Sequence, residues 1–226
     1  CQSHYLRDPR VRREAEALAQ AGFNVDIITL RDKGEPSKER VSGVNIFHLP
    51  ITRKRGNNLR SFFEYFWFFS LSSFCLFYLY LKRRYTLIQI HTMPDFLVFS
   101  AIIPKILGAK VILDAHEPMP ELFMSKYKLP RNNFLIKLME IQEKISFRFP
   151  NHLITVHEPL RKLFIERNRI RPNKIDVVLN VPDNKIFKNM QLKLTNKPDN
   201  QCVLVNACTV AERYGLDIAI KGIDLL

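Results

Sequence analysis

The sequence predicts an α/β protein in which a parallel sheet is covered by helices on both faces. Short runs rich in β-branched residues alternate with segments of helical periodicity along most of the chain, and such alternation is typical of parallel sheets. A hydrophobic content of 46% with only 7 glycines in 226 residues is enough for a packed core. Together these observations favour a doubly covered sheet over a helical bundle or a disordered chain.

The first helix is expected to begin at Asp8-Pro9, an N-cap residue followed by proline at the first helical position, and to end at Gly22. Short apolar runs then predict strands at 25–30, 44–49 and 87–91. A further helix should open at Pro94 and end near Gly108. Pro104 is expected to kink or restart that helix, because proline lacks the backbone N–H.

The second half of the chain continues the alternation and then loses it. The predicted elements are a strand at 110–114, a helix at 134–149, a strand at 153–156, a helix at 159–167 and a strand at 177–179. Prolines, asparagines and lysines then indicate a linker, and a strand at 202–205 with a helix after Gly215 begins a second unit. We therefore divide the chain into an N-terminal domain (1–180, its first strand missing), a linker (181–200) and a truncated second domain (201–226).

The formal charge of +13 implies an anionic partner, which could be nucleic acid, a phospholipid surface or a phosphorylated small molecule. Nucleic acid is not favoured, because the sequence lacks an RNA-binding aromatic motif and charge is its only support. The four cysteines form no CxxC pair, so we expect reduced thiols in a cytoplasmic protein rather than disulfides or zinc. No bound metal is expected.

The aromatic segment 61–81 is long enough to span a bilayer, at roughly 20 residues. A single span is not expected, because basic clusters flank both ends and the strands on either side must share one sheet. Two interpretations stay open. The segment is either a core helix or a helix in the membrane interface, with Trp67, Arg83 and Arg84 at the level of anionic headgroups.

Titratable residues crowd the loop after the strand at 110–114. Ligands of open α/β sheets bind beyond the carboxyl ends of strands, so His116 is the candidate catalytic residue and Glu117 a candidate substrate ligand.

Two other strand ends carry candidate substrate-binding residues. His91 and Asp95 follow one strand, beside a predicted helix start whose free N–H groups suit an anion. An equal interpretation is that Asp95 only stabilises the helix dipole. His157 follows the strand at 153–156 and is expected at the same sheet edge.

Five segments resemble, in the same order, motifs of family 4 glycosyltransferases. They are RDPRVRREAEAL with AGFNV (7–18 and 21–25), MPDFLV (93–98), LDAHE (113–117), VLNVPD (178–183) and TVAERYGLD (209–217). The resemblance implies a GT-B architecture, in which two Rossmann-like domains face each other across a cleft. It further implies a retaining, metal-independent transfer without a cofactor, with the acceptor on the N-terminal domain and the nucleotide-sugar on the other.

By the same resemblance, His116 matches a histidine near the reaction centre, and Arg213 would neutralise the donor diphosphate. The sequence departs from the family at 207–209, where relatives have a glycine-rich turn, and at Tyr214, where lysine is common. The family's first strand would precede Cys1 and its paired glutamates would follow position 226. The chain alone is therefore expected to be inactive.

We expect the complete protein to be a hexosyltransferase that moves a sugar from a nucleotide-sugar to a lipid-linked or polysaccharide acceptor. It would act as a peripheral protein at the cytoplasmic face of the plasma membrane. Two alternatives stay open, namely a non-catalytic basic domain that docks on membranes or on a partner, and a nucleotide-sugar epimerase. The sugar, the nucleotide and the acceptor are not specified by any motif.

Overall fold

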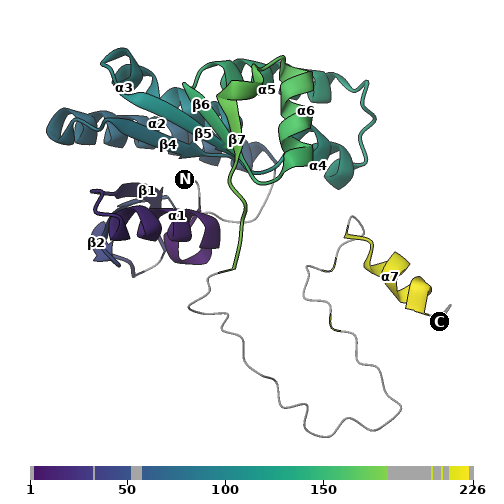
Figure 1. The fold of residues 1–226 in the computed structure, drawn as a ribbon, viewed down its shortest axis with the longest axis horizontal. Helices are drawn as coiled ribbons and strands as arrows, with labels where there is room; N and C mark the ends of the chain where they lie inside the picture. The colour runs from purple at the N-terminus through teal and green to yellow at the C-terminus, as the bar shows by residue number, and fades with distance from the viewer. Residues whose placement is uncertain are drawn as a thin grey trace, which may run out of the picture. The chain divides into compact units, whose positions relative to one another are not determined.

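The structure is a computed structural model that describes residues 3–32, 34–51, 58–182, 205, 210 and 214–223, with side chains of the long second helix described from residue 63. The chain divides into two units, Cys1–Val181 and Pro182–Leu226. The first unit is an α/β structure with two groups of strands (Figure 1). In the second unit the described helix is α7 (Leu216–Ile223), as expected after Gly215. The predicted strand at 202–205 falls almost wholly outside the described residues.

The first sheet has the order β1-β3-β2, with β1 at Asp26–Leu30, β2 at Lys38–Val41 and β3 at Val44–Leu49. Strands β1 and β3 are parallel, whereas β2 is antiparallel to β3. The sequence did not predict β2, because its run Lys-Glu-Arg-Val is too charged to resemble a buried strand. A tight turn with positive φ at Ser42 and Gly43 brings this polar edge strand back along β3.

The second sheet is wholly parallel and has the order β4-β5-β6-β7 (Figure 1). Its strands span Leu87–His91, Lys110–Ala115, His152–Thr155 and Ile175–Val177. The first three agree with the predicted strands to within one residue at each end. Strand β7 begins two residues earlier than predicted, after a short 3-10 turn, η3 (Pro172–Lys174). The parallel order brings the carboxyl ends of all four strands to one edge.

Helices α1 (Pro9–Gln20) and α2 (Asn58–Arg83) cover opposite faces of the first sheet. Alternate residues of a strand point to opposite faces, and Ile46 of β3 packs with Val11 of α1 while Leu49 packs with Phe68 of α2. The predicted cap of α1 is confirmed, because Asp8 Oδ1 accepts a hydrogen bond from the Val11 backbone N–H at 3.2 Å. A 3-10 turn, η1 (Tyr5–Arg7), precedes it.

The second sheet is covered by η2 (Asp95–Ala101), α3 (Ile102–Ile106), α4 (Met119–Tyr127), α5 (Phe134–Arg148) and α6 (Glu158–Asn168). The helix expected from Pro94 instead starts as the 3-10 helix η2, with Pro94 as its N-cap. Pro104 lies in the first turn of α3, where a helix needs no N–H at that position. Helix α4 was not predicted, because its sequence was interpreted as part of a binding loop.

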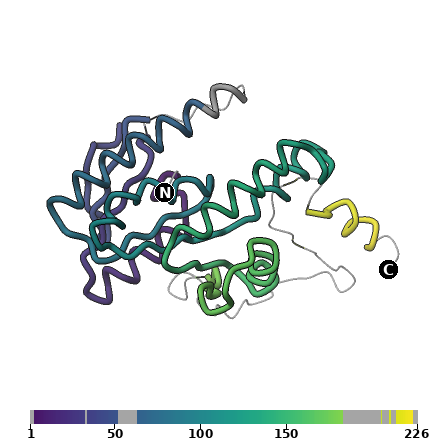
Figure 2. The backbone as a smooth tube through the Cα atoms, turned by 90° about the horizontal axis from the view of Figure 1, so that it is seen from above, coloured from purple at the N-terminus to yellow at the C-terminus, as the bar shows by residue number. Residues whose placement is uncertain are grey.

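Helix α2 is buried along one stripe and exposed along the other, so the core interpretation holds for one face and membrane contact of residues 61–81 stays a prediction. One stripe is buried, as shown by Phe68 at 2% exposure, and the other is open, as shown by Trp67 at 57%. Figure 2 shows the helix along its length beside the sheets. The other large open side chains on this stripe are Phe63, Phe66, Phe74, Tyr78 and Leu81. No helix among the described residues is long and apolar enough to cross a membrane.

Candidate functional site

The candidate site is built around Asp114, a fully buried carboxylate near the carboxyl end of β5. Arg10, in the first turn of α1, donates from Nε and Nη2 to the two carboxylate oxygens, each at 2.9 Å. Such a bidentate pair is strong and holds both groups in one orientation. Arg10 Nη1 also donates to the Val178 carbonyl oxygen at 2.9 Å, so this residue ties α1 to β5 and to the segment after β7.

Two histidines converge on the same carboxylate. His116 Nε2 lies 2.8 Å and His91 Nδ1 3.1 Å from Asp114 Oδ2. The register of β4 and β5 sets His91 opposite Asp114, and the rings of the two histidines meet edge to face. Thr92, which follows β4, is joined to the segment after β5, because its hydroxyl oxygen accepts a hydrogen bond from the His116 backbone N–H at 3.0 Å. The sequence predicted both histidines at this edge, and the structure brings them together.

The hydrogen bonds decide the protonation of this group. Burial by itself raises the pKa of Asp114, but the hydrogen bonds from His116, His91 and Arg10 outweigh it and hold that pKa well below its usual range. Burial lowers the pKa of His91, against the opposing effect of the Asp114 carboxylate. An oxygen of ionised Asp114 can only accept a hydrogen bond, so its 2.8 Å contact with His116 Nε2 favours a proton on that nitrogen, which also lies 3.2 Å from Arg10 Nε.

Glu14 lies one helical turn after Arg10 on α1 and borders the cluster of Asp114 and the two histidines on that side. Its Oε1 is 3.2 Å from Arg10 Nε, and its Oε2 accepts from Gln89 Nε2 at 2.7 Å. Burial, followed by the negative charge of Asp114, raises the pKa of Glu14, while Arg10 opposes the shift. The site therefore joins α1, β4 and β5 in one buried polar cluster.

The other predicted site residues lie apart from this cluster or have local roles. Glu117 is exposed next to His116. His157 is exposed and caps α6, where its Nδ1 accepts from the Leu160 N–H at 3.1 Å. This cap is a structural role that explains the residue without a ligand. Arg213 lies outside the described residues.

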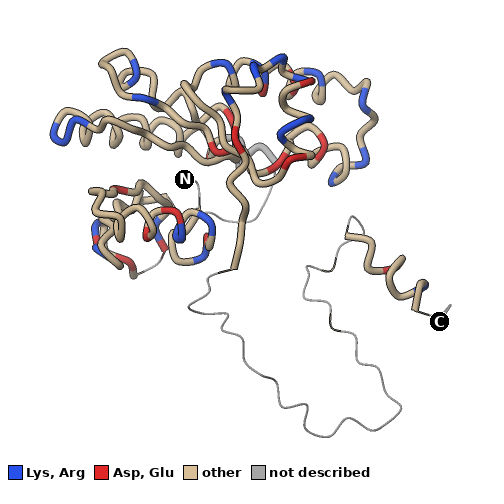
Figure 3. The backbone as a smooth tube through the Cα atoms, in the orientation of Figure 1, with Lys and Arg blue, Asp and Glu red and all other residues tan. Residues whose placement is uncertain are grey.

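The residues predicted for the membrane lie on or just after α2. Trp67 is open, as described above. The Arg83 guanidinium donates to Asp26 Oδ1 at 2.8 Å, and that of Arg84 lies over the Tyr80 ring. With Lys82 they form a basic end of α2, which is visible in Figure 3.

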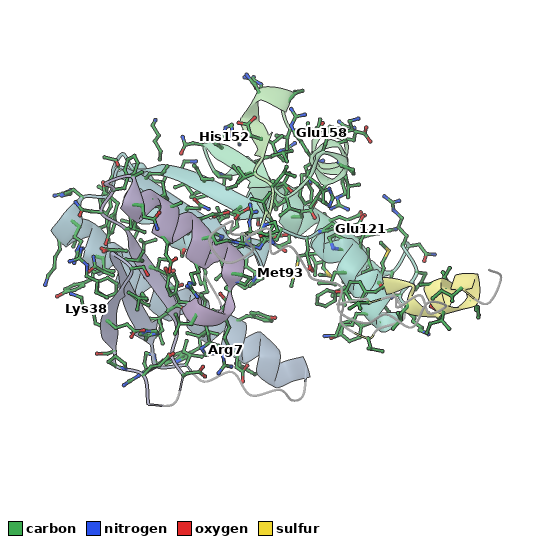
Figure 4. The ribbon with its side chains drawn as sticks, turned by 60° about the horizontal axis from the view of Figure 1, so that its bottom comes forward. Arg7, Lys38, Met93, Glu121, His152 and Glu158 are labelled. Atoms are coloured by element: carbon green, nitrogen blue, oxygen red, sulfur yellow. The ribbon has the colours of Figure 1, made fainter. Side chains whose placement is uncertain are left out.

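Asp95 belongs to a second buried cluster rather than to the Asp114 group. It is 1% exposed, and its two carboxyl oxygens have no hydrogen-bond partner among the described residues. The charges acting on it are Glu143 of α5 and Arg167 of α6, which are joined by hydrogen bonds of 2.9 and 2.6 Å. Arg167 also pairs with Glu121 of α4, which Figure 4 labels. Burial, reinforced by Glu143, raises the pKa of Asp95 to about 8, against Arg167.

The raised pKa of Asp95 predicts a pH-dependent stability. Between the ordinary value near 4 and about 8, the folded chain binds one proton more than the unfolded chain, so stability falls as pH rises through this range. We expect Asp95→Asn to raise the free energy of unfolding by a few kcal/mol at pH 8 and to change it little at pH 4. Urea denaturation at the two pH values measures this. The exposed Glu166→Gln is the control, and an equal effect of Asp95→Asn at both pH values would contradict the assignment.

The ligand atoms of His91, Asp114 and His116 lie within 4.8 Å of one another, which is close enough to surround a metal ion. Arg10, however, already donates to both oxygens of Asp114. A divalent cation would have to displace this guanidinium or share the carboxylate with it, and the two positive charges would repel each other. The donor set therefore suits an arginine–carboxylate pair better than a metal centre.

Sequence reasoning missed Arg10 and Glu14 as members of the site, and it included Asp114 in the run of titratable residues without giving it a role. Arg10 stands in a run with two other arginines and two glutamates, which resembles a solvated helix face. The available signal was the position of Asp114 at a strand end inside an apolar run, since a buried carboxylate there requires a cationic partner.

The parallel sheet, with its polar cluster at the carboxyl edge, places the first unit in the α/β class and resembles one half of a GT-B glycosyltransferase. The chain belongs to Glycosyltransferase Family 4, whose family model matches residues 10–183.

Two solved structures share this fold. A sucrose-phosphate synthase from Thermosynechococcus elongatus aligns with a TM-score of 0.59 at 18% identity, over 79% of this chain and 43% of its own. A second structure of sucrose-phosphate synthase from the same organism gives a TM-score of 0.54 at 16% identity, over 75% of this chain and 83% of its own. This chain thus spans less than half the length of the first. We found no match to this sequence among curated proteins.

Proposed function

We propose that the complete protein transfers a sugar, with retention of configuration and without a metal ion, from a nucleotide-sugar to a lipid-linked or polysaccharide acceptor. The bond between the anomeric carbon and the diphosphate oxygen would be replaced by one to an acceptor hydroxyl oxygen. The observation that carries this proposal is the cluster of Asp114, His116, His91 and Arg10 at the carboxyl edge of a family 4 domain.

In this proposal His116 contacts the sugar and Asp114 positions His116. The ionised carboxylate holds Nε2–H, which leaves the ring nitrogen Nδ1 and the exposed neighbour Glu117 to meet sugar hydroxyls. A negative Asp114 also favours positive charge that develops on the sugar as the leaving group departs. Arg213 is proposed to bind the donor diphosphate.

The test of this function is release of nucleoside diphosphate by the complete protein from a panel of nucleotide-sugars, with and without lipid-linked and polysaccharide acceptors. Acceptor-dependent release that persists in EDTA supports the proposal. Conversion of the sugar to its epimer without an acceptor would instead establish the epimerase alternative. No turnover of any donor in the panel would favour a domain that only docks.

We also propose that the open stripe of α2 lies against an anionic membrane surface on the cytoplasmic side. Trp67, Phe74 and Tyr78 are exposed on this stripe, and aromatic side chains of this kind favour the headgroup level of a bilayer. The basic end of α2 would add about 1 kcal/mol for each Lys or Arg near anionic lipid. This placement would bring a lipid-linked acceptor to the same protein that binds the sugar donor.

Trp67 is the sole tryptophan of the chain and reports directly on this surface. We expect its fluorescence to shift to the blue with vesicles that contain phosphatidylserine, and to be quenched when those vesicles carry brominated acyl chains. Vesicles of zwitterionic phosphatidylcholine should have a much smaller effect, because these lipids carry no net charge and do not attract the basic end of α2.

Two variants distinguish binding through the exposed stripe of α2 from nonspecific adsorption of exposed apolar side chains to vesicles. Phe74→Ser should weaken vesicle flotation, whereas Phe134→Ser, an equally exposed position on α5, should not. An unchanged Trp67 spectrum with both kinds of vesicle would count against membrane contact.

A further inference from the structure

The segment that follows β7, residues 178–181, is held in place by arginines of α1 and not by burial of its own side chains. Val178, Leu179 and Val181 are 40%, 62% and 57% exposed. None of them belongs to an apolar cluster of the described residues. Figure 1 shows the chain running from β7 past α1. The 178–181 segment is also the last part of the first unit, which ends at Val181.

Two arginines of α1 bind this segment. Arg10 Nη1 donates to the Val178 carbonyl oxygen at 2.9 Å. Arg13 donates from its two terminal nitrogens, one to the side-chain oxygen of Asn180 and one to the Val181 carbonyl oxygen. Residues three positions apart lie on the same side of a helix, so both arginines reach the segment from one stripe of α1.

Arg13 restrains the carbonyl group that Arg10 binds. The Val178 backbone N–H donates to the Thr155 carbonyl oxygen at 2.8 Å, directly after the ladder of β6 and β7. The Val178 carbonyl oxygen, however, belongs to the next peptide plane, and that plane rotates about the bond between Cα and the carbonyl carbon. The contacts of Arg13 at positions 180 and 181 hold this plane from its other side.

The Arg10 guanidinium joins the 178–181 segment to the candidate site. Its Nη2 donates to Asp114 Oδ1, and its Nε lies 2.9 Å from Asp114 Oδ2 and 3.2 Å from His116 Nε2. A guanidinium is planar, and its N–H groups have fixed directions within the plane. The bond from Nη1 to the segment therefore restricts how far the plane can turn, and with it the acceptor of the Nε–H group.

Asp114 Oδ2 has more nitrogen neighbours than it can satisfy. Arg10 Nε, His116 Nε2 and His91 Nδ1 all lie within 3.1 Å of this oxygen, whereas a carboxylate oxygen offers only two lone pairs. The single hydrogen on Arg10 Nε therefore has two acceptors, Asp114 Oδ2 and His116 Nε2. In the first arrangement His116 carries its proton on Nε2. In the second arrangement Nε2 accepts, and the proton is on Nδ1.

We propose that Arg13 and Asn180 are positioning residues, which select the tautomer of His116 through the 178–181 segment. While the segment is bound, the Arg10 Nε–H is directed at the carboxylate, and the histidine keeps its proton on Nε2. When the segment is released, the guanidinium turns toward His116 Nε2. The Nε2 proton is then lost to water, and another is taken up from water at Nδ1, so that the ring stays neutral.

The consequence for sugar transfer rests on the proposed function, in which His116 Nδ1 meets sugar hydroxyls. Release of the 178–181 segment would turn this nitrogen from an acceptor into a donor. It would also remove the hydrogen bond from His116 to the ionised Asp114. Because the second unit begins at Pro182, a displacement of the chain at that point would reach His116 through the same contacts.

The test is nitrogen NMR of the complete protein with isotopically labelled histidines, because protonated and unprotonated ring nitrogens have distinct chemical shifts. The His116 signals are assigned by their absence in His116→Ala. Asn180→Lys places a second positive charge beside Arg13 and should release the segment. We expect the ratio of the Nε2–H form to the Nδ1–H form to fall about fivefold, which is the effect of one lost hydrogen bond. Arg13→Ala should change the ratio in the same direction.

Two control variants accompany these changes. Asn180→Asp keeps an acceptor for Arg13 and should give the His116 signals of the unmodified protein. Arg12→Ala removes a neighbouring arginine that pairs with Glu16 instead of the 178–181 segment, and should also leave these signals unchanged. Thermal unfolding of each sample establishes that the variants are folded.

The ring signals decide this inference separately from the proposed function. Unchanged His116 signals in both Asn180→Lys and Arg13→Ala would overturn it, and so would an equal change in Arg12→Ala. Turnover should fall in proportion to the molecules that lose the Nε2–H form, so full turnover of Asn180→Lys with altered signals would refute the positioning role. If the unmodified protein transfers no sugar, the proposed function fails, whereas altered signals in the two releasing variants would still support the control of the tautomer.

Discussion

Replacing His116 with alanine in the complete protein is expected to reduce sugar transfer by about 100-fold or more, with little change in stability. The side chain is partly open, and its ring donates to an Asp114 carboxylate that Arg10 still satisfies. The loss should appear in kcat more than in KM, because the charge that His116 is proposed to stabilise develops only in the transition state. Steady-state release of nucleoside diphosphate, together with thermal unfolding of the same samples, measures both effects.

His152→Ala is the matched control for this prediction. His152 also contacts a carboxylate, since its Nε2 lies 2.8 Å from Asp176 Oδ2. It lies at the start of β6 and thus at the opposite edge of the sheet (Figure 4). Its removal should leave turnover unchanged. A turnover of His116→Ala equal to that of the unmodified protein would remove His116 from the mechanism.

Replacing Arg10 with alanine is expected to cost about 3–5 kcal/mol of stability. Arg10 is 5% exposed and supplies two of the hydrogen bonds of a fully buried carboxylate. Without the guanidinium, Asp114 is left as a buried charge with only the two histidines as partners. Urea denaturation measures the loss. Arg12→Ala removes a partly exposed arginine that pairs with Glu16 on the same helix, and should cost only about 0.5 kcal/mol.

The pH dependence distinguishes loss of this ion pair from loss of packing. The pKa of Asp114 is depressed in the folded chain, so the carboxylate contributes stability above its ordinary pKa near 4 and loses it as pH falls below that value. Arg10→Ala should therefore destabilise strongly at pH 7 and less at pH 3. The double variant Arg10→Met/Asp114→Leu should recover much of the loss. An equal loss of unfolding free energy for Arg10→Ala at pH 7 and pH 3 would show that the variant loses packing rather than a charge interaction.

Local signals predicted most of the elements, because they depend on residues close in sequence. Asp8 and Pro9 specify the start of α1, and the apolar runs of β3, β4 and β5 lie at the predicted positions. The failures are equally local. Strand β2 is charged, and α4 begins at Met119-Pro120 within a loop rich in prolines, so neither has the periodicity of a buried element.

The candidate site was predicted in part. His91 and His116 were found because parallel strands bring their carboxyl ends to one edge, a property of the fold class. Asp95 was predicted for the same site, but the turn after β4 carries it to the cluster of Glu143 and Arg167. Three residues separate His91 from Asp95, and no sequence pattern predicts the direction in which such a turn carries the chain.

The sequence by itself determined the fold class, the family and the edge of the sheet where the candidate site lies, because periodicity, capping and motif order depend on residues close together in the chain. Only the tertiary structure decided which charges meet. Arg10 and Asp114 are separated by 104 positions, and their pairing depends on how α1 packs across the sheet. The same holds for α2, whose aromatic residues look alike in sequence although packing buries Phe68 and leaves Trp67 open. Burial and long-range pairing arise from the summed packing of the whole unit, which no local pattern contains.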